Sequence, residues 1–173
     1  IDYLAFLAPG ILAQSVLFVA IFNGISVIWE RDLGIVHKFL ASPAPRTSLV
    51  LGKALSSGLR ALIQALIVYA LAVALGIEIV WSLPALLGSI TLILLGAGLF
   101  STFSLIIACI VKTRERFMGV GQVLTMPLFF ASNAIYPIDI MPAWLKAIAN
   151  VNPLTYLVDG LRAMMLGLNT GTV

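Results

Sequence analysis

The feature that most constrains the fold is a series of long apolar runs without charge. Residues 3–28 and 83–111 contain no Asp, Glu, Lys or Arg. A helix over either run would be about 40 Å long, enough to cross a hydrocarbon core of about 30 Å. Only 10% of the 173 residues are charged, against about 25% in globular chains, and a soluble fold of this size cannot bury several such runs. The sequence therefore predicts an integral membrane protein.

Four membrane spans are expected, joined by short polar loops, in a single all-α polytopic domain. The second and fourth spans cover about residues 49–77 and 117–136. Lys53 and Arg60 share one face of the second span, and both side chains can extend towards the loop that precedes it. Pro127 predicts a kink in the fourth span, because proline removes a backbone donor inside a helix.

The longest polar interruption is Trp29–Lys53, between the first two spans. It holds four of the ten Lys and Arg residues, the only histidine, and two prolines, Pro43 and Pro45. Apolar residues at positions 33, 36 and 40 predict an amphipathic helix over about 30–41, which the prolines end. From periodicity alone, this helix could equally dock on a partner or rest on lipid headgroups.

After Tyr136, short amphipathic segments replace the spans. Residues 142–150 predict a short helix, and residues 153–166 a second one, with Asn152 as N-cap and Pro153 at the first helical position. The second helix has an apolar face and a polar face. The polar face is formed by Thr155, Asp159 and Arg162. We therefore expect two amphipathic helices on the outer face of the membrane rather than a further span.

The basic residues predict the orientation in the membrane. Eight Lys and Arg residues lie in or next to the loops 30–48 and 112–116, and two lie on the opposite side. The positive-inside rule places both loops in the cytoplasm and the two ends of the chain outside. We expect a multi-pass protein of the inner or plasma membrane of a prokaryote. Because the chain begins at Ile1 without a Met, we also expect a segment of a longer protein.

Motifs for catalysis and metal binding are not found. The sequence has no HExxH, no GxSxG and no Cys/His cluster. Gly52 and Lys53 do not complete a phosphate-binding loop, because Thr47 stands in place of its first glycine and Ala54 follows the lysine. We expect no catalytic residue, metal or cofactor in this chain. Nucleic-acid binding is also not expected, because the basic residues lie in short loops beside apolar spans.

Uncharged polar residues inside the spans are the candidates for a translocation path. They are Gln14, Asn23, Gln122, Ser132 and Asn133. None of them is charged, so the sequence predicts no proton relay or ion site. The more frequent role of such residues is hydrogen bonding between helices. An uncharged interior fits an amphiphilic cargo better than an ion.

Two groups of motif residues occur in a fixed order along the chain. The first group comprises ERDLG at 30–34, Phe39-Leu40, Pro43, Arg46 and Gly52-Lys53; the second comprises SNAIYP at 132–137, Met141-Pro142, Trp144-Leu145, NPLTY at 152–156, Asp159 and Leu161-Arg162. Together they resemble the signatures of ABC-2-type exporter permeases, the membrane subunits of drug, lipid and polysaccharide exporters. The resemblance covers essentially the whole chain. Three departures are Asp32 in place of Glu, His37 in place of an acid, and Asn133 in place of Gly.

The resemblance implies a family fold of six spans, of which this segment supplies the second to the fifth. The loop after the first span here would be a coupling helix that docks on a separate ABC ATPase subunit, which binds ATP and Mg. Its coupling residues would be Glu30, Arg31, Asp32, Gly34, Lys38 and Arg46. The outer-face motif would be Tyr136, Pro137, Asn152, Pro153, Asp159 and Arg162. A second permease half would complete a homo- or heterodimer in contact with membrane lipid.

The functional prediction is a permease subunit of an ATP-driven exporter that moves a drug, lipid or glycan out of the cytoplasm. The chain itself would not be an enzyme. One alternative is a non-transporting scaffold that recruits a cytoplasmic partner through the same loop. Another is an ATP-independent channel or carrier, which the lack of buried charge and of inverted repeats disfavours.

Overall fold

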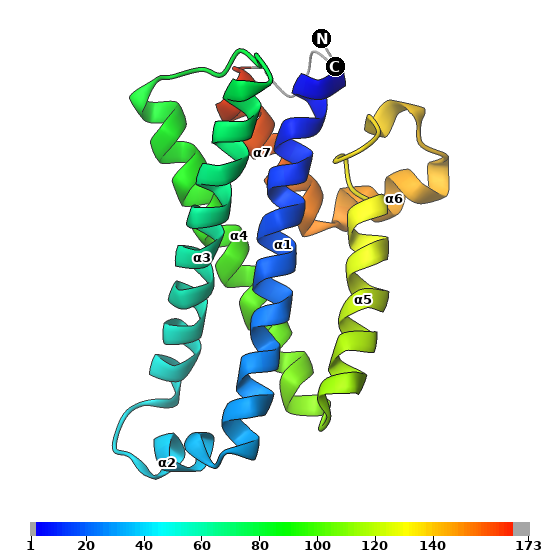
Figure 1. The fold of residues 1–173 in the computed structure, drawn as a ribbon. Coiled ribbons are helices and arrows are strands. Elements are labelled where there is room, and N and C mark those ends of the chain that lie inside the picture. Colours follow the sequence, from blue (N-terminus) through cyan, green and yellow to red (C-terminus); the bar gives the residue numbers. More distant parts are fainter. Residues whose placement is uncertain (1–2, 168–173) are drawn as a thin grey trace.

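The computed structural model describes residues 3–167, and every regular element in that range is helical. In chain order the elements are α1 (Tyr3–Asp32), α2 (Ile35–Ala41), α3 (Arg46–Ala74), α4 (Leu83–Ile110), α5 (Arg114–Phe130), a 3-10 turn (Ile138–Ile140), α6 (Ala143–Val151) and α7 (Pro153–Leu166). The long helices stand side by side around α1, which packs against α3, α4, α5 and α7 (Figure 1). The predicted all-α polytopic architecture is confirmed.

Within residues 3–167, three helices are long and apolar enough to cross a membrane: α1, α3 and α4. They match the first three expected spans to within a few residues. The second of them begins at Arg46, directly after Pro45, which has an extended conformation and no N–H for a helix to use. The number of spans in a membrane stays a prediction.

α5 is shorter than the expected fourth span, ending at Phe130 instead of residue 136. At this end of α5, side chains donate the hydrogen bonds that the backbone N–H groups of a longer helix would have supplied. The Ser132 hydroxyl donates to the carbonyl of Phe129 (2.6 Å), and the Asn152 amide donates to the carbonyl of Leu128 (2.6 Å). Because the last carbonyls already have partners, the chain can leave the helix here and turn back.

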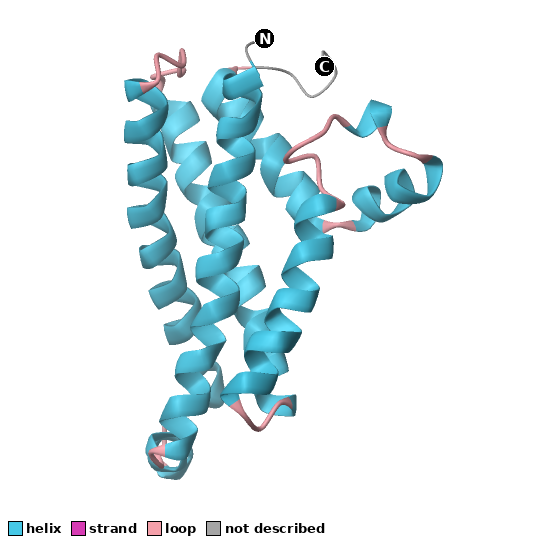
Figure 2. Ribbon diagram, turned by 45° about the vertical axis from the view of Figure 1, so that its right-hand side comes forward, coloured by secondary structure: helices cyan, strands magenta, loops and turns pink. Residues whose placement is uncertain are grey.

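α7 contradicts the expectation of an amphipathic helix on the membrane surface. It packs against α1 and α4 (Figures 1 and 2). Its apolar face is buried, and so are Thr155 and Arg162 of the expected polar face, whereas Tyr156 is 64% exposed. Small residues allow the close approach: a Cβ on Gly96 of α4 would lie 2.8 Å from the side chain of Leu157, and one on Gly160 of α7 would lie 2.8 Å from Leu92. Since Gly96 lies near the middle of α4, the first half of α7 reaches deep into the bundle.

The expected helix over 30–41 is also wrong in its boundaries. α1 continues to Asp32, and a separate helix of only seven residues, α2, begins at Ile35. Gly34 between them has φ 72° and ψ 7°, a left-handed conformation that glycine adopts without strain. α2 and the α4–α5 loop lie at the same end of the bundle, opposite the start of α1 (Figure 2). We call this end the α2 end.

Candidate functional site

The α2 end brings together the end of α1, α2, the start of α3 and the α4–α5 loop. Because residues 29–32 are helical, their side chains point in different directions from α1. Glu30 contacts α3, Arg31 contacts the end of α4, and Asp32 contacts α5. The motif residues therefore connect three neighbours of α1 instead of forming one surface.

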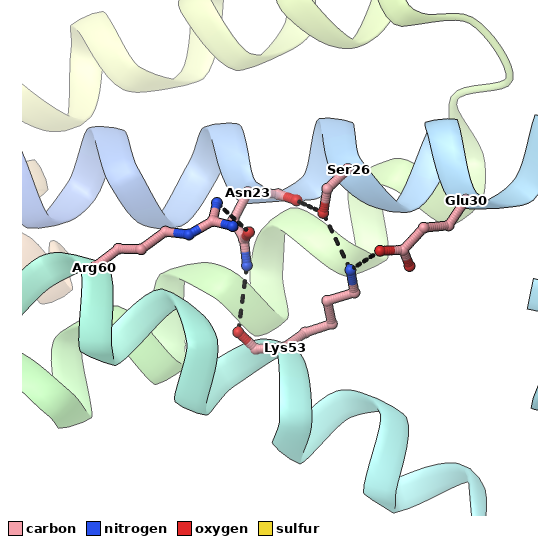
Figure 3. Close-up of polar contacts among 5 residues, drawn as sticks. All are labelled: Asn23, Ser26, Glu30, Lys53 and Arg60. Atoms are coloured by element: carbon pink, nitrogen blue, oxygen red, sulfur yellow. Dashed lines mark hydrogen bonds and ion pairs between the residues drawn. The ribbon is translucent and has the colours of Figure 1, made fainter. Parts of the chain in front are cut away.

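An ion pair closes the base of the α2 loop. Lys53 Nζ pairs with Glu30 Oε1, and it also donates to Ser26 Oγ at 3.2 Å (Figure 3). Both charged side chains are largely buried. The contact joins the end of α1 to α3 across the intervening loop.

The polar seam between α1 and α3 continues inwards from this ion pair. The Asn23 amide donates to the carbonyl of Lys53 at 3.3 Å, and its oxygen accepts from Arg60 Nη1 at 3.4 Å (Figure 3). Ser26 Oγ also donates to the carbonyl of Asn23 at 2.7 Å. Asn23 is therefore bound within the seam, as interhelical hydrogen bonding predicts.

Arg31 caps the end of α4 and does not face outwards. Its guanidinium group donates to the carbonyls of Ala108 (3.1 Å), Val111 (3.2 Å) and Lys112 (3.0 Å). These are carbonyls at or just beyond a helix C-terminus, where intrahelical donors are missing and a cation is favoured. The buried Phe117 lies beside this contact, in a small apolar cluster with Ala108. Arg31 thereby joins α1 to the α4–α5 loop.

A second contact reinforces this junction. Arg114 lies over the ring of Trp29, with its guanidinium carbon 3.5 Å from the ring centroid, and pairs with Asp32 at 3.7 Å. Both charged side chains of that pair are about half exposed. An exposed pair of this kind contributes little stability, so the Arg31 hydrogen bonds are the stronger part of the junction.

α2 is held at its two ends but buries none of its own residues. Phe39 and Leu40 are each more than half exposed, and Leu33 just before the helix is 68% exposed. A cavity of about 570 Å³ lies between α2 and the start of α3. The predicted coupling residues Lys38 and Arg46 are exposed and form no ion pair within residues 3–167. This surface is suited to contact with another molecule.

The predicted path residues do not form one group. Asn133 lies at the opposite end of the bundle from Asn23, and Ser132 is buried at the end of α5. Gln14 is half-buried on α1, and Gln122 is exposed on α5. Their assignment to a path stays a prediction.

Asn133 belongs instead to a buried polar cluster with Asp159 and Arg162 of α7. Its side-chain amide donates to Asp159 Oδ1 at 2.6 Å, and its backbone carbonyl accepts from Arg162 Nη2 at 2.9 Å. Arg162 pairs with Asp159 at 3.4 Å and lies 4.0 Å above the ring of Phe6. Burial lowers the pKa of the Arg162 guanidinium group, and the charge of Asp159 opposes that shift. The cluster ties α7 to α1 and to the turn after α5.

The remaining residues of the outer-face motif lie at the start of α7 and next to the 3-10 turn. Asn152 caps α7, accepting from the Leu154 N–H at 3.0 Å, and Pro153 occupies the first turn as predicted. Tyr136 is half exposed, and Pro137 precedes the 3-10 turn.

The seam between α1 and α3 has one signal in the sequence that could have identified it. Ser26 and Glu30 lie four residues apart, and therefore on one face of α1.

These features define an all-α polytopic membrane protein with a helical loop presented at one end. The sequence model of the ABC-2 type transporter family matches residues 2–166. The chain therefore belongs to the ABC-2 type transporter family. The predicted family resemblance is confirmed.

Named relatives support the same class. The chain is 32% identical over 162 residues to ycf38 of Cyanophora paradoxa, named as a transport permease, covering 93% of the chain and 56% of that protein. It is 32% identical to YbhR of Escherichia coli K12, named as a multidrug ABC transporter permease, over 92% of the chain and 43% of that protein. It is 24% identical to the daunorubicin resistance ABC transporter permease protein DrrB1 of Streptomyces coeruleorubidus, over 96% of the chain and 59% of that protein.

The chain spans about half the length of these relatives. They come from bacteria and from the alga Cyanophora paradoxa, so a prokaryotic source stays a prediction. No solved structure matches the chain.

Proposed function

We propose that this chain is the helical core of an ATP-driven exporter permease whose α2 end docks on a separate ABC ATPase in the cytoplasm. The observation that carries the proposal is the exposed apolar surface of α2, formed by Leu33, Phe39 and Leu40, on a loop anchored at its base. The excess of basic residues at this end supports a cytoplasmic position for it, in a protein of the inner or plasma membrane. ATP and Mg would be bound by the partner.

The contacts at the α2 end give a route by which a displacement of α2, caused by the bound ATPase, would reach the long helices. A partner that binds the two conformations of the permease with different affinities shifts their equilibrium. Movement of α2 would pass to α1 and α3 through Glu30 and Lys53, and to the end of α4 and the α4–α5 loop through Arg31. Two permease halves would then open and close a path between them. The path candidates Gln14, Asn23, Gln122, Ser132 and Asn133 are all uncharged, which favours an amphiphilic cargo, in keeping with the drug named for DrrB1.

Docking is tested on the full-length protein by replacing Phe39 and Leu40 together with serine. Because both side chains are exposed, the fold should be retained, whereas loss of two apolar anchors should weaken ATPase binding about tenfold or more. Co-purification of the ATPase and cargo-stimulated ATP hydrolysis in liposomes measure the effect. Ile110→Ser is the control, because it removes an even more exposed apolar residue at the same end, on α4. Undiminished ATPase binding by the double variant would show that α2 is not the docking surface.

The ion pair at the base of the loop is tested by charge exchange. Lys53→Glu places two carboxylates together, so we expect transport to fall about threefold or more through like-charge repulsion. Adding Glu30→Lys restores an opposite pair in reversed order and should recover most of the transport. If the double variant is no better than the single one, the ion pair does not carry the coupling.

A scaffold that recruits a cytoplasmic partner without transport is the second candidate, because the exposed surface of α2 fits it equally well. The liposome measurement separates the two: a scaffold binds its partner but shows no cargo-dependent hydrolysis.

A further inference from the structure

The cavity beside α2 opens along the seam between α1 and α3, and we call it the seam cavity. It has a volume of about 570 Å³. Val36, Phe39, Leu40 and Leu49 form its apolar wall. Towards the membrane it extends along α3 through Lys53 to Ser56. Ser56 lies one helical turn from Arg60, so the cavity ends just below that side chain.

The charges around the seam cavity are mostly positive. Arg46 and Lys53 line it, and Glu30 is its single acidic residue. Glu30 is already paired with Lys53. Arg46 and Arg60 form no ion pair within the described part of the chain. The seam therefore carries positive charge that the protein does not balance there.

Among the basic residues of the seam, Arg60 is unusual because it lies inside a membrane-spanning helix. It is two turns beyond Lys53, about 10 Å further along α3. It is exposed, and its only hydrogen bond in the described structure is the long one to Asn23 (3.4 Å). Its side chain extends from α3 to Asn23 of α1, on the side of the seam where Lys53 lies (Figure 3). A charged side chain at this position is costly unless it finds a partner.

We propose that the seam cavity binds the headgroup of an anionic phospholipid from the leaflet on the α2 side. Arg60 would contact the phosphate, with the Ser56 hydroxyl as a further donor from the cavity wall. The acyl chains would lie against the exposed apolar face of α3, at Leu55, Leu59 and Ile63. This lipid site goes beyond the proposed function, because it requires neither an ATPase nor transport.

The position of Arg60 favours a lipid over a soluble ligand. A cytoplasmic protein can reach Arg46, which lies at the start of α3. It cannot reach a residue about 20 Å further along a helix whose outer face is apolar. A phospholipid is the anion that occupies that depth, and long basic side chains near the ends of spans extend towards its headgroup.

The test uses the full-length protein in detergent, supplied with phosphatidylglycerol or phosphatidylcholine of equal chain length, with bound lipid measured by native mass spectrometry. We expect preferential retention of phosphatidylglycerol, reduced about fivefold in Arg60→Gln and preserved in Arg60→Lys. Arg116→Gln is the control, since Arg116 is an exposed arginine at the same end outside the cavity. Equal retention of both lipids, or full retention of phosphatidylglycerol by Arg60→Gln, would overturn the proposal.

A second variant tests the cavity without changing any charge. Gly52 lines the cavity, and a Cβ added there meets nothing within 4 Å. Gly52→Trp should therefore fill the space without disturbing the helices and should also release phosphatidylglycerol. Glycerol phosphate, which has no acyl chains, should not displace the lipid. Lipid retained in full by Gly52→Trp would show that the cavity does not hold the headgroup, and displacement of the lipid by glycerol phosphate would show that the cavity takes a soluble phosphate ligand instead.

Discussion

Replacing Arg162 with leucine is expected to destabilise the helical bundle strongly, because its guanidinium group joins three segments inside the protein. It donates to the carbonyl of Asn133 at 2.9 Å, pairs with Asp159 at 3.4 Å and lies over the ring of Phe6. Leucine fills part of the space but leaves the Asp159 carboxylate without its countercharge and the Asn133 backbone carbonyl without this donor. Breaking a buried ion pair in this way costs about 3 kcal/mol. The full-length protein in detergent should melt several degrees lower.

The contribution of the buried contacts is isolated by two further variants. Arg116→Leu makes the same chemical change at an exposed position and should leave the melting temperature nearly unchanged. Arg162→Lys keeps the charge but cannot make the forked contacts of a guanidinium group, so its stability should be intermediate. An Arg162→Leu protein that melts with the wild type would show that α7 is held by its apolar contacts with α4 alone.

The membrane helices could be predicted from sequence because the bilayer imposes a simple requirement. A span must be long, apolar and helical, and uncharged runs such as 83–111 reveal it directly. The N-terminal cap of α7 was equally visible, because Asn152 and Pro153 act within one turn of the chain. Such features depend on neighbours in sequence.

The boundary between α1 and α2 was missed although a local signal was present. Gly34 follows the charged residues Arg31 and Asp32, a pattern typical of a helix end that closes with a left-handed glycine. The apolar stripe at 33, 36 and 40 suggested a continuous helix, because a stripe does not register a break of two residues. The consequence is functional: residues 30–32 belong to a membrane helix and move with it.

The burial of α7 could not be predicted, because it depends on contacts between distant parts of the chain. Thr155, Asp159 and Arg162 form a polar face, which on an isolated helix indicates exposure to water. In the structure, Asp159 and Arg162 of that face meet polar groups supplied by the turn after α5 and by α1. No periodicity within 153–166 indicates that such partners exist. The same limit applies to Arg31, whose partners lie about 80 positions away in sequence.

Arg31→Ala is expected to reduce cargo transport by about tenfold or more while leaving ATPase binding intact. The family resemblance assigns Arg31 to the docking segment, but its guanidinium group donates to three carbonyls at the end of α4 and is not presented to a partner. Hydrogen bonds from a charged group are among the stronger ones in proteins. Without them, movement of α1 would no longer reach the end of α4 and the α4–α5 loop. Transport and ATPase co-purification in the same preparation measure the two effects separately.

The pattern across variants distinguishes a positioning residue from a docking contact. Arg31→Lys keeps a cation at the C-terminus of α4 and should restore part of the transport, whereas Arg116→Ala, an exposed change at the same end, should have little effect. Amide hydrogen exchange at residues 113–117 should rise in Arg31→Ala, because the loop loses its cap. If Arg31→Ala instead loses the ATPase as the Phe39/Leu40 variant does, with exchange unchanged, Arg31 acts at the docking surface and the junction with α4 does not transmit the movement.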